Sequence, residues 1–278
     1  MDDAQWRSDD WGVLDTHPDD EIARLSRLVC EEASIPGFID ARRFALEALR
    51  LEPGSTLVEL GVGPAPYAGV TMPLLGPTGT WIGIDSTSGF VRDAQVRAAQ
   101  VGGCQAQFHC ADARSVPLPS ASADAAIADK LLIHVAPISQ VVREMVRIVR
   151  PGGWVAACDA EGDALFVHAS DLSLSRRILR HCAELRPTSN AASLAAEEFS
   201  REGLVDVQRR GFMIVMSDKS FSFVPHIVEH WAARSAAAGV ITDLEAQTWL
   251  RDVLGKEETS SVLVCFPLIV TWGRKPQA

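Results

Sequence analysis

Short apolar runs alternate with helical stretches through the middle of the chain. Five runs have the length and composition of buried strands, at residues 58–60, 80–85, 106–110, 123–129 and 154–158. Before the last of them, residues 140–149 carry apolar side chains at helical spacing and stop at Arg150-Pro151-Gly152-Gly153. A proline and two glycines are expected to end that helix and turn the chain into the fifth strand. Strands that alternate with helices predict an α/β fold with a parallel sheet.

Further elements are expected on both sides of this alternation. Residues 19–50 predict two helices, separated at 34–37. Beyond the fifth strand the chain is expected to leave the sheet at 159–166, followed by helical residues 171–202 with a break at 186–188, a strand at 205–215, helices at 225–238 and 242–254, and a last strand at 260–270. The first eighteen residues, with Trp6 and Trp11 among acids, form either a loosely docked tail or a lid. A chain of 278 residues is expected to form a single domain.

The loop after the first strand is the most informative segment. It reads Val58-Glu59-Leu60-Gly61-Val62-Gly63-Pro64-Ala65-Pro66, in which two glycines permit unusual dihedral angles and a close approach of a ligand to the backbone. A strand that ends in such a loop predicts a nucleotide-like ligand at its carboxyl end. A dinucleotide site would need glycine or alanine where Pro66 stands, so that interpretation fails. The remaining E-x-G-x-G pattern is weak by itself, because glycine pairs are common in turns.

Acids at the ends of the next two strands strengthen this interpretation. Asp85 ends the second strand, where a carboxylate can accept hydrogen bonds from both hydroxyls of a ribose. Asp112 follows the third strand, and its carboxylate together with a neighbouring backbone N–H could hold an adenine edge. The alternative for both acids is that they cap the helices that follow.

These segments together resemble the class I S-adenosylmethionine-dependent methyltransferases of the ubiquinone/menaquinone-biosynthesis-like type. The matching segments are 58–63, 83–85, 111–113 and 147–153, within a resemblance that spans roughly residues 45 to 160. The resemblance implies a Rossmann-like seven-stranded sheet of order 3-2-1-4-5-7-6 with an antiparallel last strand. It also implies one domain over residues 1–278, made of an N-terminal helical lid (1–50), a core that binds S-adenosylmethionine (51–160) and acceptor-side helices with the last two strands (161–278).

The resemblance also implies the residues that bind the donor, S-adenosylmethionine, whose product is S-adenosylhomocysteine. The methionine end is expected near Glu59, Gly61 and Gly63, the ribose at Asp85 and Ser86, the adenine at Asp112 and Ala113, and Asp129, Lys130 and Leu131 beneath the donor. One departure is Ala65, which stands where the family usually has a third glycine. This change could stiffen the loop or alter how the methionine part sits.

Few residues need be chemically active in methyl transfer, because the protein mainly binds the donor and aims the acceptor. His134 is the candidate base for an acceptor that must lose a proton, and its alternative role is to organise the loop after the fourth strand. Tyr67 either touches a ligand or packs. A second set of candidates follows the fifth strand, for most of which exposed loop positions are an equally good explanation: Asp159, Glu161, Asp163 and His168.

His226 and His230 stand four positions apart on one predicted helix, a spacing that metals use, but the sequence offers no third ligand at a readable spacing. No metal is therefore expected. Apolar side chains of the C-terminal half could form the wall of an acceptor site or simply pack in the core: Phe221, Phe223, Trp231 and Trp249.

The leading functional hypothesis is transfer of a methyl group to O, N or C of a small, partly apolar metabolite, in secondary metabolism. The alternatives are a cyclase or isomerase, or a binding protein, that uses the donor or its product as a structural cofactor. An oxidoreductase is a more distant alternative. Fold alone does not decide among these chemistries.

Composition limits the partners. The chain has 36 acidic and 26 basic residues and a formal charge of −10, with no basic cluster larger than Arg42-Arg43 or Arg209-Arg210. Nucleic-acid binding is therefore disfavoured.

Six widely spaced cysteines without a C-x-x-C pair, and an acidic start without an apolar signal, predict a reduced cytoplasmic protein. The longest apolar run, 262–270, is too short to span a bilayer. A homodimer is a further expectation.

Overall fold

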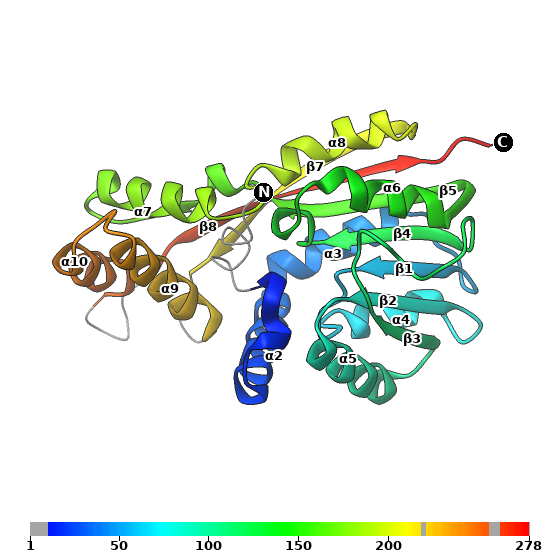
Figure 1. The fold of residues 1–278 in the computed structure, drawn as a ribbon, viewed down its shortest axis with the longest axis horizontal. Helices are drawn as coiled ribbons and strands as arrows, with labels where there is room; N and C mark the ends of the chain where they lie inside the picture. The colour runs from blue at the N-terminus through cyan, green and yellow to red at the C-terminus, as the bar shows by residue number, and fades with distance from the viewer. Residues whose placement is uncertain (1–10, 218–220, 256–261, 278) are drawn as a thin grey trace.

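A twisted mixed sheet forms the centre of the computed structural model, which describes residues 11–217, 221–255 and 262–277 (Figure 1). Its strands are β1 (Thr56–Leu60), β2 (Thr80–Asp85), β3 (Gln105–Cys110), β4 (Ala123–Asp129), β5 (Val149–Ala160), β6 (Phe166–Val167), β7 (Val205–Met216) and β8 (Val264–Arg274). Strands β1 to β5 are mutually parallel in the order β3-β2-β1-β4-β5, and β8 pairs antiparallel with β5. The expected α/β class and strand order are therefore confirmed.

The sheet has eight described strands instead of the expected seven. Strand β7 runs along one edge of β8, from Val264 to Arg274, and corresponds to the expected sixth strand. On the other edge, β5 pairs with β8 as far as Leu268, and β6 pairs with Val264 and Cys265. Two residues are too few to give a recognisable strand pattern, so β6 could not be predicted. Through β6 the segment after β5 rejoins the sheet, although the sequence predicted that this segment leaves the sheet.

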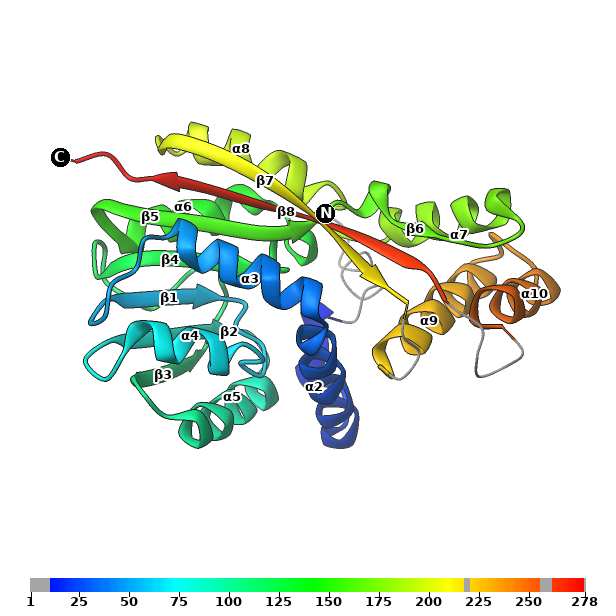
Figure 2. The ribbon, with the colours of Figure 1, turned by 180° about the vertical axis from the view of Figure 1, so that it is seen from behind.

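Helices cover both faces of the sheet (Figures 1 and 2). On one face lie α6 (Ile138–Ile148) and α8 (Ala191–Arg201), and on the other lie α3 (Pro36–Ala48) and α4 (Ala68–Leu75). The helix α5 (Ser88–Val101) packs against β2 and β3. Because both faces are covered, β1 and β4 are almost continuously apolar, with Leu57, Val58 and Ala126 fully buried.

The Pro151-Gly152-Gly153 segment lies within β5, although the sequence predicted a turn before that strand. The helix α6 does end at Ile148, but β5 begins at once with Val149, which pairs with Ala123. The next pair is Ala125 with Trp154, so residues 150–153 bulge out of the ladder. A Cβ on Gly153 would lie 2.4 Å from the Asp124 carbonyl oxygen, which explains why this bulge needs a residue without a side chain.

The remaining helices form a second lobe at the far end of β7 and β8. It contains α7 (Leu172–Glu184), α9 (Phe223–Ala237) and α10 (Asp243–Leu254), with the short η3 (Gly162–Ala164) in contact with α7. Trp231 and Trp249 are fully buried here, and Trp249 Nε1 donates to Ser175 Oγ at 2.7 Å. These two residues are therefore core residues, and neither lines the cavity at the carboxyl ends of the strands.

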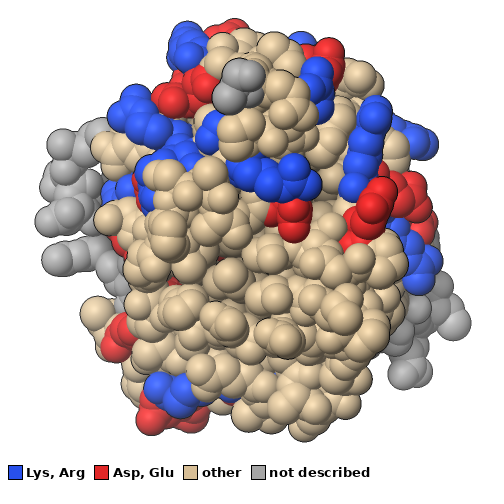
Figure 3. Space-filling view, turned by 90° about the vertical axis from the view of Figure 1, so that its right-hand side faces the viewer, with Lys and Arg blue, Asp and Glu red and all other residues tan. Residues whose placement is uncertain are grey.

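Between this lobe and the strands lies α2 (Asp19–Ser34), preceded by η1 (Trp11–Thr16). It contacts α5 on one side and α9 on the other. A cleft lies between α2, α9 and the carboxyl ends of the strands. The opposite end of the molecule carries the amino ends of the strands. Figure 3 shows that charged side chains gather in the upper part of that end, while much of its lower part carries no charge.

The described termini bear on two expectations. Trp6, which was expected in a tail or lid, lies outside the described residues, as do the first two positions of the expected last strand, Ser260 and Ser261. That strand instead extends to Arg274. Within the described part of the chain, none of the helices combines the length and hydrophobicity needed to cross a bilayer.

Candidate functional site

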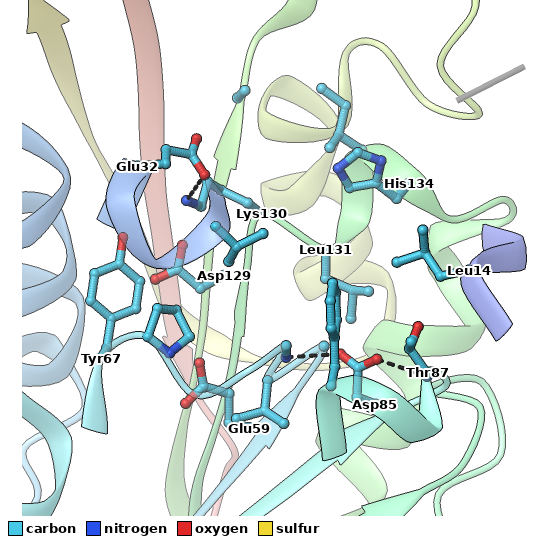
Figure 4. Close-up of a pocket in the computed structure, with 18 of the residues that line it drawn as sticks. Leu14, Glu32, Glu59, Tyr67, Asp85, Thr87, Asp129, Lys130, Leu131 and His134 are labelled. Carbon is cyan, nitrogen blue, oxygen red and sulfur yellow. Dashed lines mark hydrogen bonds and ion pairs between the residues drawn. The ribbon is translucent and has the colours of Figure 1, made fainter. Parts of the chain in front are cut away.

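A cavity of about 190 Å³ lies at the carboxyl ends of β1, β2 and β4 (Figure 4). In Figure 4, Tyr67, Asp129 and Glu59 lie on one side of it and His134 and Leu14 on the other. The helices α2 and α9 also contribute to its wall. A cavity at this place in a parallel sheet is where α/β proteins bind ligands.

Of the residues that were predicted to bind the donor or to act as the base, nine line this cavity and two do not. Those in its wall are Glu59, Gly61, Gly63, Asp85, Ser86, Asp129, Lys130, Leu131 and His134. Asp112 and Ala113 are not in the wall. Half of the Asp112 side chain is exposed, and Arg114 holds its carboxylate through Nε and Nη2. The hydrogen bonds from Arg114 lower the pKa of Asp112.

The glycine loop has the conformation that the sequence predicted. Gly61 and Gly63 have φ of +70° and +56°, in the left-handed region. A Cβ on Gly63 would meet no atom within 4 Å, so its backbone faces open space that a ligand can occupy. Ala65 has φ of +55° and is fully buried, so the alanine keeps the left-handed conformation that a glycine would adopt more easily.

Asp85 joins this loop to the end of the second strand. Its Oδ2 accepts the Gly63 N–H at 2.8 Å and its Oδ1 accepts the Thr87 N–H at 2.9 Å. Burial raises the pKa of Asp85, and the two N–H donors oppose that shift. The carboxylate therefore fixes the glycine loop to the residue that precedes α5, and it lies in the wall of the cavity.

A buried cation, Arg42 of α3, organises the opposite wall. It donates through Nη1 and Nη2 to both oxygens of Glu59, at 2.9 and 2.6 Å, and through Nη1 to Asp129 Oδ2 at 3.3 Å. Its Nη2 also donates to Thr71 Oγ1 at 3.0 Å, and its guanidinium lies 5.1 Å from the centre of the Tyr67 ring. Burial alone would lower the pKa of Arg42, but the two carboxylates raise it above its usual range.

In the sequence, Arg42 stands out only as half of the basic pair Arg42-Arg43. Its position could have been recognised, because Phe38, Ala41 and Ala45 place it on the apolar stripe of α3, where an arginine needs a buried partner. Because Arg42 occupies both oxygens of Glu59, that acid is held rigidly at the end of β1. Burial raises the pKa of Glu59 and Arg42 opposes this shift.

A second ion pair borders the same wall. Lys130 Nζ lies 2.7 Å from Glu32 Oε2 of α2, with both side chains mostly buried, and 4.7 Å from the centre of the Phe38 ring. The Tyr67 ring is 5.9 Å from the same ammonium, and burial raises the pKa of Tyr67 above its usual range. This part of the cavity wall therefore presents one positive and one negative group, Lys130 and Glu32. An amino acid, with its ammonium and carboxylate, requires both kinds of partner.

Asp159 lies beneath the loop that carries His134. It is buried, and its carboxylate accepts the backbone N–H groups of Leu132 and Ala160, at 2.6 and 3.0 Å. Burial raises the pKa of Asp159 to about 7. Because Leu132 begins η2 (Leu132–His134), Asp159 fixes the turn that brings His134 to the cavity. It acts on the backbone and does not line the cavity itself.

The other candidates after the fifth strand lie away from the cavity. Glu161 accepts hydrogen bonds from the N–H and Oγ of Ser193, and neither Asp163 nor His168 lines the cavity. His226 and His230 of α9 line a separate, adjoining cavity with their ring centres 6.1 Å apart. Among the residues that the structure describes, no group of three or more His, Cys, Asp or Glu side chains is arranged to hold a metal.

The chain is similar to known proteins over its central part. Residues 58–157 match the family model of the methyltransferase domain. An uncharacterized 37.1 kDa protein in transposon TN4556 of Streptomyces fradiae is 30% identical over 172 residues, 62% of this chain and 48% of the relative. Demethylmenaquinone methyltransferase of Listeria monocytogenes is 24% identical over 118 residues, 42% of this chain and 50% of that enzyme. The chain thus spans about half the length of these curated relatives.

A solved structure shares the fold. The crystal structure of a SAM dependent methyltransferase from Aquifex aeolicus superposes with a TM-score of 0.52 and covers 92% of this chain and 98% of that one. The two sequences are 12% identical, so this likeness concerns the arrangement of strands and helices.

Replacing Arg42 by methionine should strongly destabilise the fold, because it leaves the buried Glu59 and Asp129 carboxylates without a cation. We expect a loss of about 3–5 kcal/mol in the free energy of unfolding, measured by denaturant titration. The matched control is Arg43→Met at the next, exposed position, which should change that energy by less than about 0.5 kcal/mol. Similar losses in both variants would contradict a structural role for the Arg42 pair.

The raised pKa of Asp159 predicts a pH-dependent contribution to stability. Its pKa in the folded protein, about 7, exceeds the ordinary value of 3.8, so its contribution is present at low pH and is lost as pH rises through about 7. Asp159→Asn removes the ionisation. The free energy of unfolding of the native chain, minus that of the variant, should therefore decrease from about pH 5 to about pH 8. A difference that is constant with pH would show that Asp159 does not titrate in this way.

Proposed function

The core of this chain is a class I S-adenosylmethionine-dependent methyltransferase domain, and on that premise we propose that the protein methylates O, C or N of a small, partly apolar metabolite. S-adenosylmethionine is the cofactor, and S-adenosylhomocysteine is the product that remains after transfer. The observation that carries the proposal is one continuous cavity with the carboxylate of Asp85 at one place and an apolar wall at another.

The donor would lie along the ends of β1, β2 and β4. Asp85 would accept the ribose hydroxyls, and the open backbone at Gly63 would lie against the donor. The amino-acid end would meet the wall formed by Asp129 and Lys130. Asp112 and Ala113 remain proposed adenine contacts, although Arg114 would have to share the Asp112 carboxylate. When bound, the cofactor supplies an electrophilic methyl group on a sulfonium ion.

The chain's contribution to the chemistry is to position the reactants. Displacement at a methyl carbon requires the attacking atom to lie in line with the departing sulfur, at near-attack distance. Apolar side chains from distant parts of the chain line the acceptor side of the cavity, and they would exclude water and hold an apolar body: Ile133, Phe223, Ile227 and Phe266. Leu14 adds to this wall from η1, while Asp15 accepts the Ser88 N–H at 2.9 Å and fixes η1 to the core.

His134 is our proposed general base for an acceptor that loses a proton. It lines the cavity across from the donor loop (Figure 4), and Asp159 fixes the turn on which it stands. A base must reach the attacking atom as the methyl group arrives, and this position is on the acceptor side. Its alternative role, to organise the loop, predicts no effect on the chemical step.

The alternative function is a methyltransferase-fold cyclase, isomerase or binding protein. Its only sequence support was the altered segment Pro64-Ala65-Pro66. Since Ala65 keeps the left-handed conformation, that departure no longer favours the alternative. The net charge of −10 supports a small-molecule acceptor over nucleic acid. A cytoplasmic location, a role in secondary metabolism and a homodimer belong to the same proposal.

Two measurements test this function. Calorimetric titration with S-adenosylmethionine and S-adenosylhomocysteine should detect binding of both, and the absence of binding would refute the proposal. Transfer of a labelled methyl group to members of an acceptor panel would then separate a methyltransferase from a protein that only binds the donor.

Asp85→Ala should weaken donor binding, because two charge-assisted hydrogen bonds to the ribose are lost. Each is worth about 1.5–3 kcal/mol, so the dissociation constant of S-adenosylhomocysteine should rise at least about a hundredfold in calorimetry. The control is Asp40→Ala, at an exposed position of α3, which should leave that constant unchanged. If Asp85→Ala also binds with unchanged affinity, the ribose assignment is wrong.

His134→Ala should slow turnover without weakening donor binding. A general base contributes about 10²–10⁴-fold to the rate, and kcat for the best acceptor of the panel should fall within that range. His168→Ala is the control, because that side chain is exposed and lies outside the cavity. Unchanged kcat in the His134 variant would leave this residue only the role of organising its loop.

A further inference from the structure

A second cavity of about 220 Å³ adjoins the first, on the side away from the donor loop. It lies between η1 and α2 on one side and α9 on the other. Six residues line both cavities and therefore mark the junction between them: Leu14, Val29, Glu32, Arg186, Phe223 and Ile227. A molecule longer than the acceptor side of the first cavity would extend through this junction into the second.

The second cavity has a different character from the first. Its own wall carries a cation and three histidines, from three segments of the chain: Arg24, His17, His226 and His230. Arg186 and Glu32 stand at the junction, and Glu21 is the other acid of the wall. The wall of the second cavity therefore holds two arginines and two carboxylates, together with three histidines. Acids do not outnumber cations in this wall, although they do in the whole chain, whose formal charge is −10.

The two acids are already matched by cations. Glu32 pairs with Lys130 at 2.7 Å. Glu21 uses its two oxygens on Nε and Nη2 of Arg24, at 2.7 and 2.6 Å, and makes no hydrogen bond to Nη1 of that guanidinium. Arg24 can therefore donate from Nη1 to a second oxyanion without breaking its pair with Glu21. The imidazoles of His226 and His230 add further donors from the opposite wall.

The junction between the two cavities is mostly apolar. Leu14, Val29, Phe223 and Ile227 form it, and Leu25 and Leu28 continue the apolar surface into the second cavity. The order along the combined cavity is therefore the donor loop, His134, an apolar passage and an end that carries Arg24 and the histidines. A ligand that matches this order has a reactive atom, an apolar body and an anionic group.

We propose that the second cavity binds the anionic end of the methyl acceptor, which is therefore an amphipathic carboxylate or phosphate monoester. This inference rests on the proposed function, because it takes His134 and the donor loop to mark the reacting end. The anion would lie between Arg24 of α2 and His226 and His230 of α9, and would bridge the two helices. Neutral and cationic molecules with the same apolar body would bind more weakly.

The test compares three ligands that share one alkyl chain: decanoate, decanamide and decylamine. Their binding to the full chain is measured by calorimetry, with and without S-adenosylhomocysteine. Decanoate should bind at least about tenfold more tightly than decanamide, with decylamine the weakest, as expected for a charge-assisted site. Decyl phosphate should bind like decanoate. Equal affinity for decanoate and decanamide would overturn the proposal.

Variants locate the anion. Arg24→Gln should cost about tenfold in decanoate affinity and leave decanamide unaffected. Arg24→Lys, which keeps the charge, should retain most of the preference. The matched control is Arg176→Gln on α7, an exposed arginine outside both cavities, which should change neither affinity. The double variant His226→Gln, His230→Gln should lower decanoate affinity as Arg24→Gln does. If neither Arg24→Gln nor the double variant reduces the preference for decanoate, the anion does not bind there and the proposal is wrong.

Failure of this inference is distinguishable from failure of the proposed function. Binding of S-adenosylhomocysteine without a preference for decanoate overturns the anionic acceptor alone. A decanoate preference that requires Arg24, in a chain that does not bind S-adenosylhomocysteine, supports the anion site and removes the proposed methyl transfer.

Discussion

The ion pair between Arg42 and Glu59 is the interaction on which the site depends. It joins α3, which precedes the first strand, to the end of β1, and it reaches β4 through Asp129. Three elements that are distant in sequence thereby meet around one guanidinium. Buried charges are costly unless each is paired and hydrogen-bonded, and this cluster meets that condition for both carboxylates. One consequence is that the position of the donor wall is set by the N-terminal helices as much as by the sheet.

The two sides of the cavity are held together by different kinds of contact. On the donor side, backbone N–H groups, Asp85 and the Arg42 cluster form a rigid surface whose parts hold one another. On the acceptor side, η1, α2 and α9 line the cavity mainly with apolar side chains, and the exposed Ser222 before α9 donates its N–H and Oγ to the Glu31 carboxylate of α2. Contacts of this second kind are weaker and tolerate change. All members of the family use the same donor. Under the proposed function, sequence variation in the acceptor-side helices would change which acceptor binds and leave the donor wall undisturbed.

The sequence was sufficient where the pattern is local. Apolar runs that end in acids predicted the parallel strands and placed Asp85 at the strand end where the cavity lies, and the family resemblance implied the strand order. It was insufficient where two distant segments determine the result. The two-residue β6 exists only because β8 offers an unpaired edge beyond β5, and the bulge in β5 arises from its pairing with β4. The pairing of Asp112 with Arg114 is local, two positions apart, but the sequence alone does not distinguish it from a contact between Asp112 and an adenine.

Side-chain roles show the same division. Trp231 and Trp249 were equally compatible with a ligand wall and a core, and only the packing of α7 against α9 and α10 decides for the core. Arg42 could have been recognised on the apolar stripe of its helix, but its partners could not. The second cavity has residues from η1, α2 and α9, so no sequence motif spans it. Its chemistry becomes visible only after these segments are brought together.

The pairing of β8 has a consequence for how the protein folds. The five parallel strands are joined by short connections, whereas Ala160 of β5 meets Leu268 of β8 across the whole acceptor-side lobe. Contacts between residues so far apart in sequence form slowly, because closing a long loop costs entropy before the contact stabilises it. Residues 56–160 carry the donor loop, but its wall also needs Arg42 of α3, a helix that packs against β5, β7 and β8. Completion of that wall is therefore tied to the pairing of β8, so the two sides of the cavity must form together.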